Sequence, residues 1–352
     1  ALIERLKERK LVTNDEILFV GTDRGLESKI VPAAGVPFKT LKIKGFDRKH
    51  PLKNFETIEL FIKATKEAKQ IIKNFKPDVV VGTGGYVSGA IVYEAAKMHI
   101  PTVIDESNSV VGLANKFLAH YVDKICYTFD DAAKQFSKKK KLVKTGNPRS
   151  QQVLGLNKEN IDIAKKWDLN PNMPTVLIFG GSRGALAINQ IVEKSLPELE
   201  TKPYQVIWAT GQLYYGDVKK KLAGKEVNSN IKIVPYIDNM PGLLPQMTCV
   251  VARSGATSLA EFTALGVPVI LIPSPNVTHN HQMKNALDME KAGAALVIAE
   301  NDLNPNNFVS SIDHILLDTN YAKKMSEASK KLGVPDASDQ VISVMESLIK
   351  NK

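Results

Sequence analysis

The stretch that most constrains the fold covers residues 252–282 and reads ARSGATSLAEFTALGVPVILIPSPNVTHNHQ. Its pattern predicts the end of a buried strand, a tight turn at Gly255, a helix, and a second buried strand over residues 267–272. Ligands of open α/β sheets bind at the carboxyl ends of the strands, where this stretch gathers its polar residues. The stretch therefore predicts a nucleotide-binding βαβ unit, in which the carboxylate of Glu261 accepts hydrogen bonds from two ribose hydroxyls.

The same alternation of strands and helices runs along the chain and predicts an α/β fold class with two Rossmann-like domains. The length of 352 residues suits two domains. We expect one domain over residues 1–149, a second over residues 150–334, and a closing segment over residues 335–352 with a helix from 338 to 350. Strands are expected at residues 17–21, 38–43, 79–82, 102–105, 124–128, 142–145, 175–179, 205–209, 231–234, 250–252, 267–272 and 295–298, and helices of the first half at 55–74, 88–98 and 113–120.

The chain begins within a predicted helix, whereas a parallel α/β domain normally begins with a strand. We therefore expect a first strand and its loop to precede Ala1. No apolar run is long enough to span a membrane, and the opening ALIERLKERK is too charged for a signal peptide, which predicts a cytosolic protein. Cys126 and Cys249 lie in apolar runs, so buried free thiols are expected rather than a disulfide or a zinc site.

The net charge of +10 is concentrated in the first half of the chain. Residues 1–150 hold 27 basic and 17 acidic side chains, and the remainder holds 20 of each. This asymmetry indicates an anionic partner for one domain: an acidic membrane surface, a polyphosphate or a nucleic acid. A basic surface that only improves solubility is an equally good interpretation.

Two glycine-rich motifs follow predicted strands. FGGSRGALAIN is expected to open a helix whose N-terminus lies at residues 181–183. There the N–H groups of Ser182 and Arg183 and the Arg183 side chain are suited to a diphosphate. GTGGYVSG, which contains Gly84, Gly85 and Tyr86, is its counterpart in the first half. A plain βα turn that needs glycine for its geometry explains either motif alone, but the pair favours two phosphate-bearing substrates.

A polar cluster in IDESNSVVGLANK comprises Asp105, Glu106, Ser107 and Asn108, just past a strand end. Capping of the next helix explains one of these residues rather than four, so the others are expected to line a site. Glu106 would act either as a general base or as a group that orients neighbouring donors, and the residues alone do not choose between these roles.

Two loops of the second half add candidates. In VPYIDNMPGLLPQ, a base would stack on Tyr236 and bond to the backbone of Ile237, although an ordinary helix start explains the motif equally well. In THNHQ, His279 and His281 lack a third ligand of the expected kind, which argues against a metal site. His281 and Gln282 fit hydrogen bonds to sugar hydroxyls better.

The motifs GGYVSG, ESN, GLANK, TGNPR, GGSRGA, YIDNM, RSGATSLAE and HNHQ occur in this order over nearly the whole length. In this combination the chain resembles the MurG family of GT-B glycosyltransferases. The resemblance implies two Rossmann-like domains facing across a cleft, with the final helix returning to the first domain. It also implies an inverting hexosyltransferase that moves GlcNAc from UDP-GlcNAc to the C4 hydroxyl of MurNAc in lipid I, which yields lipid II for peptidoglycan and cell wall synthesis.

The implied partners are UDP-GlcNAc in the C-terminal domain, and the lipid I acceptor and an anionic phospholipid surface at the N-terminal domain. The implied location is the cytoplasmic face of the bacterial membrane, with no cofactor, no metal and no nucleic acid. Carried onto this chain, the family roles place the diphosphate at Ser182, the uracil on Ile237, the ribose on Glu261, and GlcNAc beside His281 and Gln282. Further substrate-binding residues are then Asn108, Arg183, Gly255, Ala256 and Thr257, with Arg149, Tyr236, Gly84, Gly85 and Tyr86 as additional candidates.

The chain also departs from the family pattern. Asp105 and Ser107 stand where members often have His and Gln, so neither is expected to carry indispensable chemistry. Arg149, which the resemblance offers as a phosphate ligand, comes one residue earlier than the arginine of the GNPVR form. The family's first glycine-rich loop, which bears a histidine discussed as a base, would precede Ala1. Two alternatives follow: another GT-B-like UDP-GlcNAc enzyme, such as a 2-epimerase or a lipid glycosyltransferase, or a UDP-GlcNAc-binding module with little activity.

Overall fold

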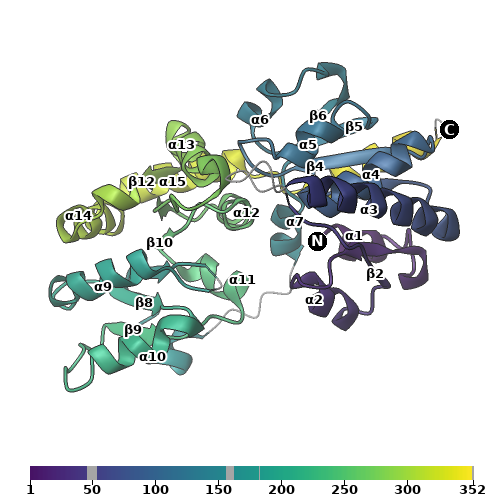
Figure 1. Ribbon diagram of the computed structural model, residues 1–352. Helices are drawn as coiled ribbons and strands as arrows, with labels where there is room; N and C mark the ends of the chain where they lie inside the picture. The colour runs from purple at the N-terminus through teal and green to yellow at the C-terminus, as the bar shows by residue number, and fades with distance from the viewer. Residues whose placement is uncertain (46–53, 156–161, 182, 351–352) are drawn as a thin grey trace. The chain divides into compact units, whose positions relative to one another are not determined.

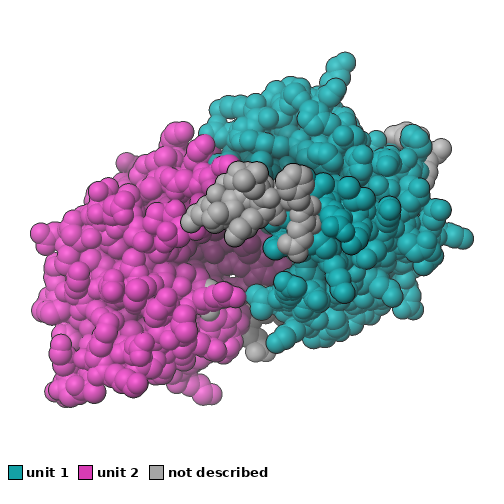
Figure 2. Space-filling view, viewed as in Figure 1, with its two compact units in different colours: residues 1–148, 336–352 teal, residues 149–335 magenta. Residues whose placement is uncertain are grey.

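The computed structural model describes residues 1–45, 54–155, 162–181 and 183–350. The chain forms two compact units, drawn in different colours in Figure 2. Unit 1 combines residues 1–148 with 336–352, and unit 2 holds residues 149–335. Both units have parallel strands joined by helices, so the predicted α/β fold class with two Rossmann-like halves is confirmed.

The strands of unit 1 form two parallel sheets among the described residues. One pairs β1 with β2, and the other has the order β3-β4-β5-β6. The elements are α1 (Leu2–Glu8), β1 (Phe19–Gly21), α2 (Glu27–Ala33), β2 (Phe38–Thr40), α3 (Asn54–Phe75), β3 (Val80–Gly82), α4 (Gly85–Lys97), β4 (Thr102–Glu106), α5 (Leu113–Leu118), β5 (Lys124–Tyr127), α6 (Asp130–Lys134), β6 (Leu142–Lys144) and α16 (Ala337–Lys350).

Helices cover both faces of the larger sheet in unit 1. On one face, α3 buries Ala64, Ala68 and Ile72, which are spaced four residues apart and so share one side of the helix. On the other face, α16 buries Val341 and Met345 against the strands. Figure 1 shows this yellow C-terminal helix beside the blue strands of the first half of the chain. The end of the sequence therefore completes the core of unit 1.

Unit 2 has one six-stranded parallel sheet with the order β12-β11-β10-β7-β8-β9. Its elements are α7 (Arg149–Gly155), α8 (Ile163–Trp167), β7 (Thr175–Phe179), α9 (Leu186–Leu199), β8 (Gln205–Ala209), α10 (Gln212–Lys221), β9 (Ile231–Val234), α11 (Met240–Leu243), β10 (Cys249–Ala252), α12 (Ala256–Leu265), β11 (Val269–Leu271), α13 (His281–Lys291), β12 (Ala295–Val297), α14 (Pro305–Leu316) and α15 (Thr319–Leu332).

The core of unit 2 centres on β7 and β8, whose residues are all buried. Trp208 on β8 is fully buried, and its indole N–H donates to Asn189 Oδ1 at 3.0 Å. The same Asn189 donates from Nδ2 to the backbone carbonyl of Thr210 at 2.9 Å. This side chain therefore ties α9 to the carboxyl end of β8.

The predicted buried thiols are confirmed, because Cys126 and Cys249 are both free and buried. Burial raises the pKa of the Cys126 thiol to about 12 and also raises that of Cys249. Both groups are therefore neutral and unreactive at physiological pH. Within the described part of the chain, no helix is both long and apolar enough to cross a bilayer.

Candidate functional site

The sheet order of unit 2 creates a topological switch point between β7 and β10. From β7 the chain proceeds to β8 and β9 on one side, whereas β10, β11 and β12 follow on the other. Ligands bind at such a point because the loops after the two central strands leave in opposite directions and open a crevice. The loops that follow β7 and β10 hold the predicted GGSRGA and RSGATS motifs, so the fold brings both motifs to one place.

The loop after β7 is tight because two of its glycines have no room for a side chain. A Cβ on Gly180 would lie 2.2 Å from the backbone nitrogen of Ala185, and one on Gly184 would lie 2.2 Å from the Thr210 carbonyl oxygen. Gly181, with φ of +93°, faces open space. This backbone permits close approach of a ligand at Gly181, while Gly184 is packed against the end of β8.

This loop differs from the expectation that residues 181–183 form a helix N-terminus. The helix α9 begins only at Leu186, with Ala185 as its N-cap. Arg183 is exposed and lies in a turn before the helix, since the left-handed conformations of Gly181 and Gly184 are not helical. Ser182 lies outside the described residues.

The loop after β10 leads directly into the helix that carries Glu261. Gly255 is the N-cap of α12, so Ala256 and Thr257 form its first turn, where backbone N–H groups lack intrahelical acceptors. Glu261 is buried, with 8% of its surface exposed, and Arg149 donates from Nε to its Oε1 at 2.7 Å. The predicted ribose carboxylate therefore lies beside a guanidinium group.

Ser254 joins the two ends of the 252–282 stretch. Its hydroxyl donates to the backbone carbonyl of Gln282 at 2.7 Å, and its own carbonyl accepts from Asn285 Nδ2 at 3.2 Å. Gln282 Oε1 accepts from the backbone N–H of Ser274 at 2.9 Å, and His281 Nδ1 contacts the Thr278 carbonyl at 2.8 Å. The structure thus places His281 and Gln282 at the start of α13, next to the RSG turn.

The third loop of unit 2 that contains candidates follows β9. Ile237 is buried, whereas Tyr236 beside it is 44% exposed. Asn239 caps the short α11, because its Oδ1 accepts from the Gly242 N–H at 3.0 Å. An exposed ring beside a buried residue whose backbone is held near a cap is a suitable edge for a flat base.

In unit 1, the candidates cluster after β3 and β4. The carboxylate of Glu106 accepts from the backbone N–H groups of Asn108 at 3.1 Å and Gly112 at 2.9 Å, and from Asn115 Nδ2 at 3.0 Å. Asn108 Nδ2 also donates to this carboxylate at 3.4 Å. A carboxylate with four donors is fixed in place and holds the loop to α5. This geometry favours the orienting role of Glu106 over the role of a general base.

The GGY motif begins a helix earlier than expected. The helix α4 starts at Gly85 instead of residue 88, and its N-cap Gly84 has φ of +92°. Ser88 donates from Oγ to the Gly84 carbonyl at 2.6 Å, and the Tyr86 ring is 43% exposed. Gly85 and Tyr86 therefore present the first turn of a long helix at the carboxyl end of β3.

Asp105 points into the interior of unit 1. Its Oδ2 accepts from Ser107 Oγ at 3.0 Å, and among the described residues no donor reaches Oδ1. Desolvation raises the pKa of this carboxyl from 3.8 to about 7; the neighbouring Glu106 adds to the increase, and the Ser107 bond opposes it. The folded protein therefore keeps a proton on Asp105 that the unfolded chain loses.

We expect Asp105→Asn to stabilise the protein increasingly as pH rises. Between about pH 4 and pH 7 the folded state binds one more proton than the unfolded state, so ionisation lowers the free energy of unfolding as pH rises through this window. The asparagine of the variant does not ionise, so it does not lower the free energy of unfolding as pH rises. Urea unfolding of wild type and Asp105→Asn should show a larger difference between their free energies of unfolding at about pH 8 than at about pH 5. An equal difference at both pH values would contradict the shifted pKa.

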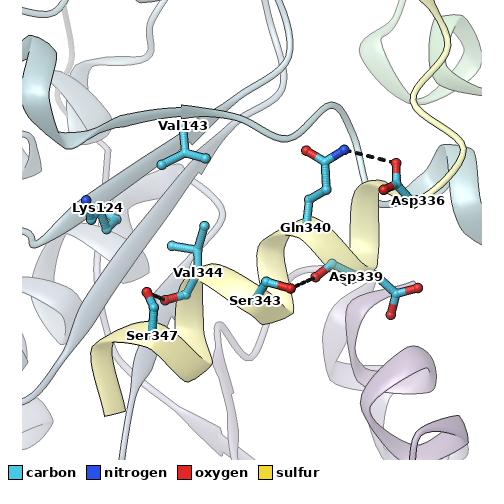
Figure 3. A pocket seen from close by; sticks show the side chains of 8 residues that line it. All are labelled: Lys124, Val143, Asp336, Asp339, Gln340, Ser343, Val344 and Ser347. Carbon is cyan, nitrogen blue, oxygen red and sulfur yellow. Dashed lines mark hydrogen bonds between the residues drawn. The ribbon is translucent and has the colours of Figure 1, made fainter. Parts of the chain in front are cut away.

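One groove among the described residues lies apart from these candidates. This groove, of about 400 Å³, lies between α16 and the strands of unit 1, and is lined by Lys124, Val143, Asp336, Asp339, Gln340, Ser343, Val344 and Ser347. Figure 3 shows these side chains and the internal bonds from Gln340 to Asp336 and from Ser343 to Asp339. Within the described ranges, no three His, Cys, Asp or Glu side chains are grouped to hold a metal ion.

Three polar residues that organise these loops were not singled out from the sequence: Asn115, Asn189 and Asn285. All three are buried and bond to loop atoms at strand ends. A buried asparagine on an apolar helix face is a usable signal, because its amide requires partners. The identity of those partners depends on which strands are neighbours.

Comparison with known proteins matches both halves of the chain. The model of the glycosyltransferase family 28 N-terminal domain matches residues 1–127, and that of the glycosyltransferase family 28 C-terminal domain matches residues 175–341. The crystal structure of MurG from Acinetobacter baumannii is similar with a TM-score of 0.75 and 23% identity, covering 98% of this chain and 94% of that one.

Curated relatives are more similar in sequence. A UDP-N-acetylglucosamine–N-acetylmuramyl-(pentapeptide) pyrophosphoryl-undecaprenol N-acetylglucosamine transferase from Lactobacillus johnsonii is 99% identical over 352 residues, covering 100% of this chain and 95% of the relative. The transferase of the same description from Lactiplantibacillus plantarum is 50% identical over 350 residues, covering 99% and 95%. The chain belongs to glycosyltransferase family 28.

Proposed function

We propose that this chain is the inverting transferase that moves GlcNAc from UDP-GlcNAc to the C4 hydroxyl of MurNAc in lipid I. The observation that carries the proposal is the meeting of the GGSRGA and RSGATS loops at the switch point of unit 2. The relative that is 99% identical is named as an N-acetylglucosamine transferase that acts on UDP-N-acetylglucosamine and N-acetylmuramyl-(pentapeptide) pyrophosphoryl-undecaprenol. The product is lipid II, which places the protein in peptidoglycan synthesis.

The donor is assigned to unit 2. The diphosphate is assigned to Ser182 and Arg183 beside the open face of Gly181, where the developing negative charge of the leaving group meets N–H donors and a guanidinium. The uracil is assigned to the backbone of Ile237 with Tyr236 alongside. Gly255, Ala256 and Thr257 lie beside the nucleotide, since their helix turn offers N–H groups to an anion.

The sugar of the donor is assigned to His281 and Gln282. Gln282 accepts the Ser274 N–H through Oε1, so the group that it offers a GlcNAc hydroxyl is its Nε2 amide. His281 is half-buried in the same turn of α13. Ser254 holds the backbone carbonyl of Gln282, which keeps this turn of α13 next to the nucleotide loop.

The acceptor is assigned to unit 1. Gly84, Gly85 and Tyr86 are assigned to the second phosphate-binding turn, for the diphosphate of the lipid, and Asn108 of the same unit is assigned to substrate binding. Glu106 is assigned to orient Asn108, because it accepts that residue's backbone N–H. The attacking hydroxyl displaces UDP in line, and the two substrates react because both are held in one orientation.

Product analysis tests the reaction directly. The chain is incubated with UDP-GlcNAc, with and without a polyprenyl diphosphate that carries MurNAc-pentapeptide. Acceptor-dependent release of UDP and a β-linked disaccharide are expected. Conversion of UDP-GlcNAc to its 2-epimer without acceptor would establish the epimerase alternative, and binding of UDP-GlcNAc without either product would establish a binding module.

Glu261→Ala is expected to weaken UDP binding by about 1.5 to 3 kcal/mol, because a buried charged acceptor of two hydroxyls is lost. Calorimetry on the full chain measures this change. Glu226→Ala removes an exposed carboxylate of the same unit and is expected to leave the affinity unchanged. If wild type and Glu261→Ala bind UDP with equal affinity, the assignment of Glu261 to the ribose is wrong.

An aromatic surface on unit 1 supports a membrane partner. Phe117 and Tyr121 are 38% and 45% exposed, and Phe117 contacts Phe61 on α3 and Tyr93 on α4. Ile58 and Ile62 on α3 and Leu113 on α5, the helices that carry Phe61 and Phe117, are exposed as well, and Lys97 lies over the Tyr93 ring. Apolar side chains with cations around them fit the boundary of an anionic bilayer.

We therefore propose peripheral attachment at the cytoplasmic face of the membrane, with anionic phospholipid bound by unit 1. Ile62→Ser is expected to weaken partition into anionic vesicles by about tenfold, since roughly half of a large apolar side chain is available for burial. Leu317→Ser is the matched control, because Leu317 in unit 2 is 55% exposed and Ile62 is 51% exposed. Co-sedimentation at two salt concentrations measures the vesicle binding of both variants. If the two variants lose vesicle binding equally, the membrane-binding surface is not the one around Ile62.

A further inference from the structure

We propose that Arg149 positions the Glu261 carboxylate for the ribose of the bound nucleotide, and thereby contributes to the preference for ribose over deoxyribose. This inference rests on the proposed function, which assigns Glu261 to the ribose. The resemblance described above had offered Arg149 as a phosphate ligand instead. The contacts of its guanidinium decide between the two roles.

The guanidinium of Arg149 is directed at the carboxylate through two of its nitrogens. Nε lies 2.7 Å and Nη2 lies 2.6 Å from the same oxygen, Glu261 Oε1. The third nitrogen, Nη1, donates to Gln152 Oε1 at 2.7 Å. All three nitrogens are thus engaged, so Arg149 would have to break short contacts before it bound a phosphate.

The backbone around this pair is held as firmly as the side chains. Ser150 donates from its buried hydroxyl to the carbonyl of Ala260 at 3.2 Å, so the residues that follow Arg149 and precede Glu261 are joined. The side chains of Arg149 and Glu261 are 25% and 10% exposed. A carboxylate this buried needs a partner charge, since one without a partner is strongly unfavourable.

The geometry leaves one oxygen for the nucleotide. An ionised carboxylate has about four acceptor positions on two oxygens. Arg149 takes both of its short contacts on Oε1, and neither uses Oε2. Oε2 is therefore the oxygen for the ribose hydroxyls, and its direction depends on the guanidinium that stops the carboxylate from rotating.

Two ligands separate a ribose role from a phosphate role: UDP and 2′-deoxy-UDP, which has the same diphosphate but one hydroxyl fewer. Arg149→Met is expected to lower UDP affinity by about tenfold. It is expected to change 2′-deoxy-UDP affinity by less than about threefold, because that ligand already lacks a hydroxyl on which the carboxylate acts. An equal loss for both ligands, as a diphosphate contact or a general loosening would produce, would overturn the proposal.

A second measurement tests whether Arg149 acts through Glu261. In the Glu261→Gln background, Arg149→Met is expected to cost less than about twofold in UDP affinity, since the positioned charge is already gone. Lys202→Met is the matched control: Lys202 is 18% exposed, pairs with Asp313 at 2.7 Å, and precedes the amino end of β8, away from the loops of the site. It is expected to leave both affinities unchanged.

The outcomes also separate this inference from the proposed function. If Glu261→Gln leaves UDP affinity unchanged, the ribose assignment itself is wrong. If Glu261→Gln weakens UDP binding and Arg149→Met does not, only the positioning role is wrong. Thermal unfolding of each variant in the absence of ligand verifies that it is folded at the temperature of the binding experiment.

Discussion

Replacing Gly184 by alanine is expected to lower the kcat/KM of GlcNAc transfer by about a hundredfold, because the added methyl group forces the phosphate loop away from its position. Gly184 has φ of +80°, and its Cβ would lie 2.2 Å from the Thr210 carbonyl oxygen and 2.8 Å from the Tyr214 ring. The carbonyl oxygen cannot retreat, since Asn189 holds it at 2.9 Å. The loop must therefore move, and the donor diphosphate moves with it.

The control for this variant is Gly224→Ala. Gly224 has φ of +79°, and nothing lies within 4 Å of the position of an added Cβ. Alanine there bears only the conformational cost of a left-handed residue, about 1 to 2 kcal/mol in stability, and kcat/KM is expected to be unchanged. Steady-state kinetics on both variants measures the difference. Wild-type kcat/KM in Gly184→Ala would show that the transfer does not depend on this loop.

Trp208→Ala is expected to lower the free energy of unfolding by about 3 to 5 kcal/mol, because it removes a large, fully buried side chain and leaves a cavity. Trp208 also donates to Asn189, which would lose one partner while it still has to hold the Thr210 carbonyl. The substitution therefore also loosens the support of the loop that contains Gly184. Urea unfolding measures the loss in stability.

The second tryptophan of the chain provides the comparison. Trp167 at the end of α8 is only partly buried and lies under Lys166, whose Nζ is 5.0 Å from the ring centroid. Trp167→Ala is expected to cost markedly less, since part of the ring is in solvent in the folded state. If both substitutions cost the same, β8 would not be the centre of the core of unit 2.

Much of the fold was predictable because the signals were local. The strands at residues 175–179, 205–209 and 231–234 were predicted with the bounds that the structure has. Strands covered on both faces read as short continuous apolar runs, which end where turn residues begin. Helix starts were less predictable: α4 begins at Gly85 and α9 at Leu186, since a glycine-rich turn is compatible with either an early or a late helix start.

The functional motifs were also visible in the sequence, but their contacts were not. The sequence left Glu106 as either a general base or an orienting group, and its four donors, from the loop after β4 and from α5, favour the second role. Arg149 was a candidate for phosphate, and its guanidinium contacts Glu261 instead. The partner of Arg149 lies 112 residues further along the chain, whereas the donors to Glu106 follow it within nine residues and meet it only once the loop and α5 have folded.

The sequence by itself determined the α/β class, the division into two halves, and the loops that carry glycine, hydroxyl and amide groups for a nucleotide sugar. Periodicity and turn chemistry act over a few residues, so they can be read without a fold. Only the tertiary structure decided that β10 lies beside β7, which brings the GGSRGA and RSGATS loops together. It also decided that Arg149 contacts Glu261. Parallel strands pair across long connections, and the hydrophobic pattern of a strand is the same whichever neighbour it takes.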